Sequence, residues 1–146
     1  MSFQPKFTWV NTPAECAYLI NKPHEDFPKR VNATESVLVT LIKNQTDLIT
    51  SFHARQIHSI LFAGESFAGK WRNCDVRIGK DFPPSHLQVP ALIEKIFPVS
   101  QGRFNLPDWY KEFQKIHPFA DGNGRVGGCA VAILSWDGVK MLAPLQ

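Results

Sequence analysis

Several residue types that handle phosphate chemistry lie together in segment 117–125, which reads HPFADGNGR. Loop glycines between two helices can leave backbone N–H groups pointing at one spot, and the dipole of the following helix completes an anion site. An acid beside such a site, here Asp121, can hold the Mg²⁺ that accompanies a polyphosphate, and Arg125 can bind another oxygen. His117 at the rim can take a proton from an incoming nucleophile. We therefore interpret the segment as a phosphate-binding catalytic loop.

Each of these residues also has a simpler interpretation. Asp121 can cap the following helix, and Gly122, Asn123 and Gly124 can form an ordinary turn, because both arrangements are common. Arg125 is expected in the first turn of a helix, where its charge opposes the positive end of the helix dipole. An anion bound between them removes this conflict, which favours the phosphate-binding interpretation.

Hydrophobic periodicity predicts helices on both sides of the motif. Residues 106–116 carry an apolar face after an Asn105 cap, and residues 126–136 are apolar all round, as in a helix buried at the centre of a fold. Further helices are predicted after a Thr34 cap, from a Ser51 cap to Gly64, and from Val89. The last of these has a proline in its first turn.

The remaining segments are predicted to be less regular. Strand-forming residues flank turn-formers in segment 69–79, which indicates a short β-hairpin. Residues 1–33 are rich in Pro, Asn and charges, so we expect an irregular N-terminal arm with at most a short helix over 13–20. Residues 34–146 are then the single folded domain.

Composition narrows the class of protein. With 146 residues and a net charge of +3, the chain fits one domain, and no run of Lys or Arg indicates a nucleic-acid partner. The three cysteines are scattered without metal-site spacing, which is typical of reduced thiols in a cytoplasmic protein. No apolar run approaches the length of a membrane span, and no signal peptide is visible.

The motif resembles the signature of Fic domains, H-x-F-x-[DE]-G-N-G-R-x-x-R. The matching residues are His117, Phe119, Asp121, Gly122, Asn123, Gly124 and Arg125. The second arginine of the pattern falls on Gly128. Segment 69–79 is similar to the "flap" hairpin of the same family, and segment 56–62 resembles the helix before it. The resemblance covers roughly residues 50–140.

The resemblance implies a mainly α-helical, Fic-like bundle with a β-hairpin flap. It implies Mg²⁺-dependent transfer of AMP from ATP to a Ser, Thr or Tyr hydroxyl of a target protein. His117 would be the general base and Asp121 the metal ligand. The phosphate cradle would consist of the backbone amides of Gly122, Asn123 and Gly124 together with Arg125. The residues expected to dock the target on the flap are Arg72, Val76, Arg77 and Ile78.

Gly128 leaves alternatives open. Without the second arginine, a charged contact to the leaving pyrophosphate is lost, so the donor is either ATP used slowly, another nucleotide or a phosphocholine donor. A catalytically silent binding module is the other alternative. The family's inhibitory pattern [ST]-x-x-x-E-[GN] is not found, so an inhibitor would be a separate small, antitoxin-like protein. Because the sequence stops soon after the motif helix, we expect either a compact family member or a piece of a longer protein.

Overall fold

The computed structural model describes residues 4–145, and this part of the chain is mainly helical. Its elements are β1 (Lys6–Val10), α1 (Pro13–Asn21), α2 (Phe27–Lys43), α3 (Ser51–Leu61), the 3₁₀ turn η1 (His86–Gln88), α4 (Val89–Ile96), α5 (Leu106–Ile116), α6 (Asn123–Ser135) and β2 (Met141–Leu145). The predicted mainly α-helical fold class is confirmed.

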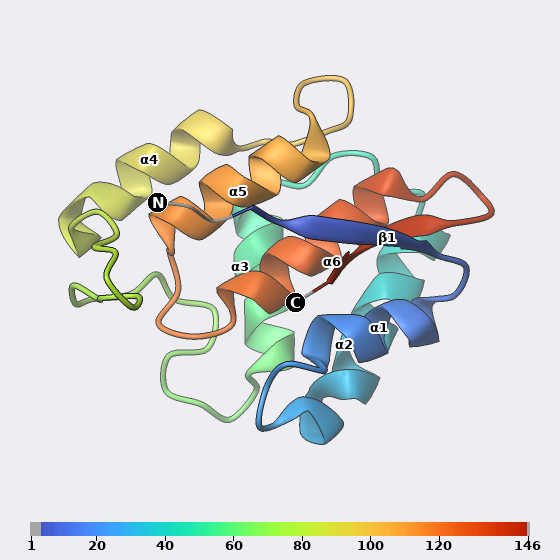
Figure 1. Ribbon diagram of the computed structural model, residues 1–146, viewed down its shortest axis with the longest axis horizontal. Helices are drawn as coiled ribbons and strands as arrows, with labels where there is room; N and C mark the ends of the chain where they lie inside the picture. The colour runs from blue at the N-terminus through green and yellow to red at the C-terminus, as the bar shows by residue number, and fades with distance from the viewer. Residues whose placement is uncertain (1–3, 146) are drawn as a thin grey trace.

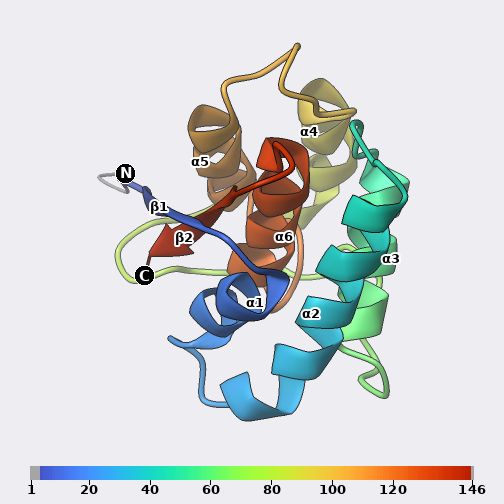
Figure 2. The same ribbon diagram turned by 90° about the vertical axis from the view of Figure 1, so that its right-hand side faces the viewer.

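Helix α6 is the centre of the fold. Figures 1 and 2 show it surrounded by α1 and α2 on one side, α4 and α5 on the other, and α3 across from the strands. Every residue of α6 except Gly124 is buried. This arrangement follows from its sequence, because a helix that is apolar all round is stable only where neighbours cover every face. The predicted central helix is confirmed.

Strands β1 and β2 form a two-stranded antiparallel sheet from the two ends of the described chain. Lys6 pairs with Leu145, and Val10 pairs with Met141 at the other end of the ladder. Met141 and Ala143 are fully buried on one face of β2. Figure 2 shows the strands on the side of α6 that faces away from α3. We call this two-stranded sheet the terminal ribbon.

The short helix predicted over 13–20 is confirmed as α1, whereas the rest of the irregular arm predicted over residues 1–33 is wrong where the structure describes it, and residues 1–3 lie outside the described part. Besides β1, a full helix α1 begins after Thr12, whose side chain accepts a hydrogen bond from the Glu15 amide. Helix α2 begins at Phe27, so Thr34 lies inside it and its hydroxyl donates to the Arg30 carbonyl at 2.9 Å. The Pro and Asn content reflects the helix starts and the turn between them.

The hairpin predicted over residues 69–79 is also wrong. Segment 70–85 contains no paired strands, and its pairing is limited to a bridge between Ile78 and Asp81. Thr50 rather than Ser51 caps α3. The caps predicted for the later helices are confirmed, since Asn105 accepts from the Asp108 amide and a proline lies in the first turn of α4.

The three cysteines are free, as predicted, with Cys16 and Cys129 buried and Cys74 exposed. Burial raises the pKa of the Cys16 thiol to about 12, which keeps it protonated and unreactive. Among residues 4–145, no helix is long and apolar enough to cross a membrane.

Candidate active site

The motif loop connects the end of α5 to the start of α6. His117 ends α5 in a left-handed conformation with φ of 51°, and Gly122 precedes α6 with φ of 85°. Phe119 between them is fully buried. The side chain of Asn123 holds this part of the loop, because its Oδ1 accepts from the Phe119 amide at 2.8 Å and its Nδ2 donates to the Phe119 carbonyl at 2.9 Å. The Asn123 side chain therefore shapes the loop, while its backbone amide stays at the helix start.

Gly122 is required by its backbone and by its neighbour. Its positive φ is unfavourable for residues with a side chain. A Cβ atom there would lie 2.3 Å from Cε2 of the Phe62 ring. The loop thus passes directly over Phe62, and only glycine allows this approach.

His58 holds the loop in place through a hydrogen bond to the Asp121 backbone. The Gly69 amide donates to its Nδ1 at 2.9 Å, which leaves the proton on Nε2 to be donated to the Asp121 carbonyl at 2.9 Å. The ring is stacked between Phe62 and Phe119, with centroid distances of 4.5 Å and 4.0 Å. Burial lowers the pKa of His58, which keeps this doubly bonded neutral form. His58 is thus a buried core residue with both ring nitrogens hydrogen-bonded.

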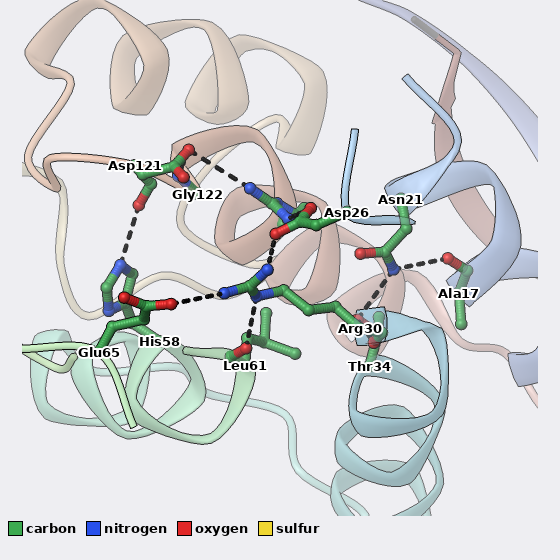
Figure 3. A network of polar contacts seen from close by, with 11 residues as sticks. Ala17, Asn21, Asp26, Arg30, Thr34, His58, Leu61, Glu65, Asp121 and Gly122 are labelled. Carbon is green, nitrogen blue, oxygen red and sulfur yellow. Dashed lines mark hydrogen bonds and ion pairs between the residues drawn. The ribbon is translucent and has the colours of Figure 1, made fainter. Parts of the chain in front are cut away.

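Arg125 is held in a buried ion network rather than exposed to a ligand. Its Nη1 lies 2.6 Å from Asp26 Oδ1, and its Nη2 lies 3.3 Å from Asp121 Oδ1. Asp26 also pairs with Arg30, whose Nε donates to the Leu61 carbonyl at 2.8 Å. Figure 3 shows the Arg30 guanidinium between Asp26 and Glu65. Arg125 is 2 % exposed and does not line the cavity described next, so its predicted role as a direct phosphate clamp does not fit this arrangement.

A cavity of about 400 Å³, which we call the motif cavity, lies over the loop. The motif residues that line it are His117, Ala120, Asp121, Gly122, Asn123 and Gly124. Tyr110 and Gln114 of α5 form a second wall. The structure therefore brings together His117, Asp121 and the three residues of the predicted amide cradle. Of the predicted site residues in the motif, only Arg125 is left out of this lining.

His117 is half-buried at the rim of the motif cavity. Burial lowers the pKa of His117, and the positive charge of Arg72 lowers it further, against a smaller opposing effect of Asp121. Arg72 is itself buried, and its Nε donates to the His117 carbonyl at 2.7 Å. The ring of His117 is therefore neutral at pH 7 and able to accept a proton.

Arg72 does not serve as an exposed docking residue. Its guanidinium donates to the carbonyls of Ile116, His117, Cys74 and Pro84, so it joins the end of α5 to segment 72–84. A cation at the C-terminal end of a helix is also favoured by the helix dipole. Of the other residues predicted to dock a target, Val76 is half-buried, and Arg77 and Ile78 are exposed.

A second cavity of about 540 Å³, the flanking groove, also borders His117. Its lining includes Ile78, Phe82 and Leu92, and the two cavities share His117 and Gln114. Phe82 is 75 % exposed, and Ile78 in the same lining is also exposed. His117 thus lines both the motif cavity and the flanking groove.

Gly128 faces the terminal ribbon and α1. A Cβ atom on it would lie 3.1 Å from Pro144 Cγ and 3.2 Å from Ile20 Cγ1. The neighbouring Gly127 packs as closely against α5, with Phe113 Cδ2 at 3.1 Å. The two glycines therefore let α6 approach its neighbours on two sides, and a side chain at 128 would require Pro144 or Ile20 to shift.

Sequence reasoning missed the cavity residues that lie far from the motif. Lys6 comes from β1, and His24 comes from the turn between α1 and α2. Burial lowers the pKa of His24, and the charge of Arg125 lowers it further. Its Nε2 is enclosed and has no hydrogen-bond partner among the described residues. No local pattern marks either residue, because only the tertiary fold brings them to the loop.

The comparisons with known proteins identify the class of protein. The sequence model of the Fic/DOC family matches residues 48–134, and the chain belongs to this family. The family includes transferases of AMP and of other groups. No curated protein sequence matches the chain.

Two solved structures are similar in fold. A Fic family protein from Desulfovibrio desulfuricans G20 shares 20% identity at a TM-score of 0.52, over 82% of this chain and 41% of that chain. A Fic domain containing signaling protein from Bacteroides thetaiotaomicron VPI-5482 shares 14% identity at a TM-score of 0.60, over 83% of this chain and 55% of that chain. The Fic-like fold is thereby confirmed, and this chain spans about half the length of either protein.

Proposed function

We propose that the protein is a Mg²⁺-dependent transferase that moves AMP from ATP to a Ser, Thr or Tyr hydroxyl of a target protein. The observation that carries this proposal is the position of His117. Its neutral ring lies at the rim of a cavity that also contains the amides at the start of α6 and the Asp121 carboxylate. Those amides and the dipole of α6 attract the phosphates of the donor.

The proposed reaction is a displacement at phosphorus. The acceptor hydroxyl oxygen forms a bond to the α-phosphorus of ATP while the bond from that phosphorus to the pyrophosphate oxygen breaks. The hydroxyl proton passes to His117, and pyrophosphate leaves with the electron pair of the broken bond. The lowered pKa of His117 supports this role, because the ring is unprotonated before the reaction.

Asp121 is suited to holding Mg²⁺. Its side chain is 59 % exposed, and its Oδ1 already accepts hydrogen bonds from the Gly122 amide and Arg125. Its Oδ2 makes no hydrogen bond within residues 4–145 and is free to coordinate a cation. Among the described residues no group of three or more potential metal-binding side chains exists. Mg²⁺ is commonly bound by one carboxylate together with phosphate oxygens and waters, and it would neutralise phosphate charge.

We propose that the target protein docks in the flanking groove. The groove opens beside His117 and offers the apolar side chains of Ile78 and Phe82, with Arg77 exposed nearby. An extended segment of the target laid along residues 76–82 would bring its hydroxyl toward His117. Backbone pairing of this kind is a common way to bind an extended peptide.

The test is a labelling reaction with α-³²P-ATP, Mg²⁺ and a cell lysate. Protein-bound label is expected with the native protein and not with His117→Ala. His53→Ala is the matched control, because His53 lies at the start of α3 and does not line either cavity beside His117. Equal labelling by native protein and His117→Ala would refute the proposed role of His117.

Transfer from a less charged donor is a second candidate function. Among the described residues, the motif cavity has one lysine and no arginine in its lining, which is little positive charge for a triphosphate. A CDP-linked phosphocholine donor carries less negative charge than ATP. Parallel reactions with labelled CDP-choline, CTP, GTP and ATP separate the two, since the preferred donor gives label that depends on His117.

A further inference from the structure

Residues outside the family match complete the motif cavity. The match covers residues 48–134, yet the lining also includes Lys6, His24, Pro144 and Leu145. Three of these belong to the terminal ribbon. Figure 2 shows β1 and β2 side by side on one side of α6, and β2 contacts this helix. The ribbon is therefore a wall of the candidate site as well as part of the fold.

The ribbon also packs closely on Gly128, the sixth residue of α6, which carries no cation. Pro144 packs on Gly128, and a Cβ there would already be tighter than normal contact distance. Pro144 pairs with Phe7 in the ladder, and the next pair is Lys6 with Leu145. Lys6 and Leu145 are therefore next along the ribbon from this covered position, and both line the motif cavity.

The charges around the cavity single out Lys6. Of the lining residues in the described part, Lys6 and Asp121 are the ones with formal charge at pH 7 when the histidines are neutral. Arg125 is paired with Asp26 and does not line the cavity. Lys6 is exposed and has no ion pair within residues 4–145. A lysine on a flexible stem acts as a point charge for phosphate oxygens, and the carboxylate in the same lining, Asp121, is paired with Arg125 rather than with Lys6.

We propose that Lys6 is a phosphate-binding residue of the motif cavity and that it holds the phosphate tail of a nucleoside di- or triphosphate. That the anion is a nucleotide rests on the proposed function, whereas binding of the phosphate groups themselves does not. The amides at the start of α6 bind one end of the anion, and the Lys6 ammonium binds the other. The terminal ribbon thus supplies the positive charge that the motif helix lacks at Gly128.

Isothermal titration of the full chain with inorganic pyrophosphate and Mg²⁺ tests the proposal. Pyrophosphate has the phosphate charge without a base, and it cannot be a donor. Lys6→Ala is expected to weaken its binding about tenfold, as for loss of a charge-assisted hydrogen bond. Lys6→Arg is expected to restore binding to within about threefold of the native value. The control is Lys22→Ala, because Lys22 is an exposed lysine in the same N-terminal part and does not line the cavity.

The fold should tolerate these changes, since the backbone pairing of Lys6 with Leu145 does not involve the side chain. Thermal unfolding of each variant checks this. Weaker pyrophosphate binding by Lys6→Ala alone, with binding restored in Lys6→Arg, supports the proposal for Lys6. This holds even if no label is transferred from ATP, because absence of label would refute the proposed function and not the phosphate site. Equal affinity of native protein and Lys6→Ala overturns it, as does an equal effect of Lys22→Ala or undetectable binding by the native protein.

Discussion

Replacing Asn123 by alanine tests the structural account of the motif loop. In the native protein, its side chain amide makes two buried hydrogen bonds, at 2.8 Å and 2.9 Å, to the amide and carbonyl of Phe119. Asn123 is 3 % exposed and Phe119 is fully buried, so water cannot readily replace the lost partners. Asn123→Ala therefore leaves one backbone donor and one acceptor without a partner.

The expected loss follows from these two groups. Each buried polar group left unpaired costs about 1–3 kcal/mol, and the lower half of that range applies if the loop relaxes. We expect Asn123→Ala to lower the free energy of unfolding by about 2–4 kcal/mol. Urea denaturation followed by far-UV circular dichroism measures this, with the midpoint and slope fitted together.

A second asparagine provides the matched control. Asn105 caps α5 with one hydrogen bond, from the Asp108 amide at 3.0 Å, in an exposed position. Asn105→Ala is expected to cost about 1 kcal/mol, the usual value for a lost cap. If Asn123→Ala cost no more than Asn105→Ala, the two bonds to Phe119 would not be what holds the loop, and the reasoning would be wrong.

Two further predictions concern Gly128 and pH. Gly128→Arg is expected to lower the free energy of unfolding by about 2 kcal/mol or more, because the new side chain must displace Pro144 and Ile20. We expect no increase in labelling from ATP. Native stability together with increased labelling would show that the position is open. Stability is expected to fall as pH decreases from about 7 to about 5, measured as the urea midpoint. Burial lowers the pKa of His24, His58 and His117 in the folded state, so the unfolded chain binds more protons in this window, and an unchanged midpoint would contradict these directions.

The sequence predicted the elements that depend on local patterns. Helices α4, α5 and α6 were predicted from their apolar faces, and Asn105 marked a start because a cap acts within one turn. The sequence also located the loop itself, since the glycine at 122 reflects a backbone conformation. What it predicted best was the central helix and the placement of His117 beside the helix start.

The features it missed depend on partners far apart in the chain. Pairing of β1 with β2 joins the two ends of the described part of the chain, and a five-residue strand without its partner has no distinctive local pattern. The position of the Arg125 guanidinium is set by Asp26, 99 residues away. The hairpin prediction was wrong for a related reason. Arg72 donates hydrogen bonds to carbonyls at the end of α5 and in segment 72–84, so this segment is held by contacts other than strand pairing.

The terminal ribbon has a consequence for how the protein opens. Its pairing closes a loop that extends from Val10 to Met141. The entropy cost of closing such a loop is offset only when the helices between the two strands are already folded. A short two-stranded sheet is therefore a unit that can separate while the helices remain folded. Amide hydrogen exchange in β1 and β2 reports this local opening. Each opening also removes one wall of the motif cavity, so a ligand that spans the ribbon and α6 slows exchange at the two ends of the chain.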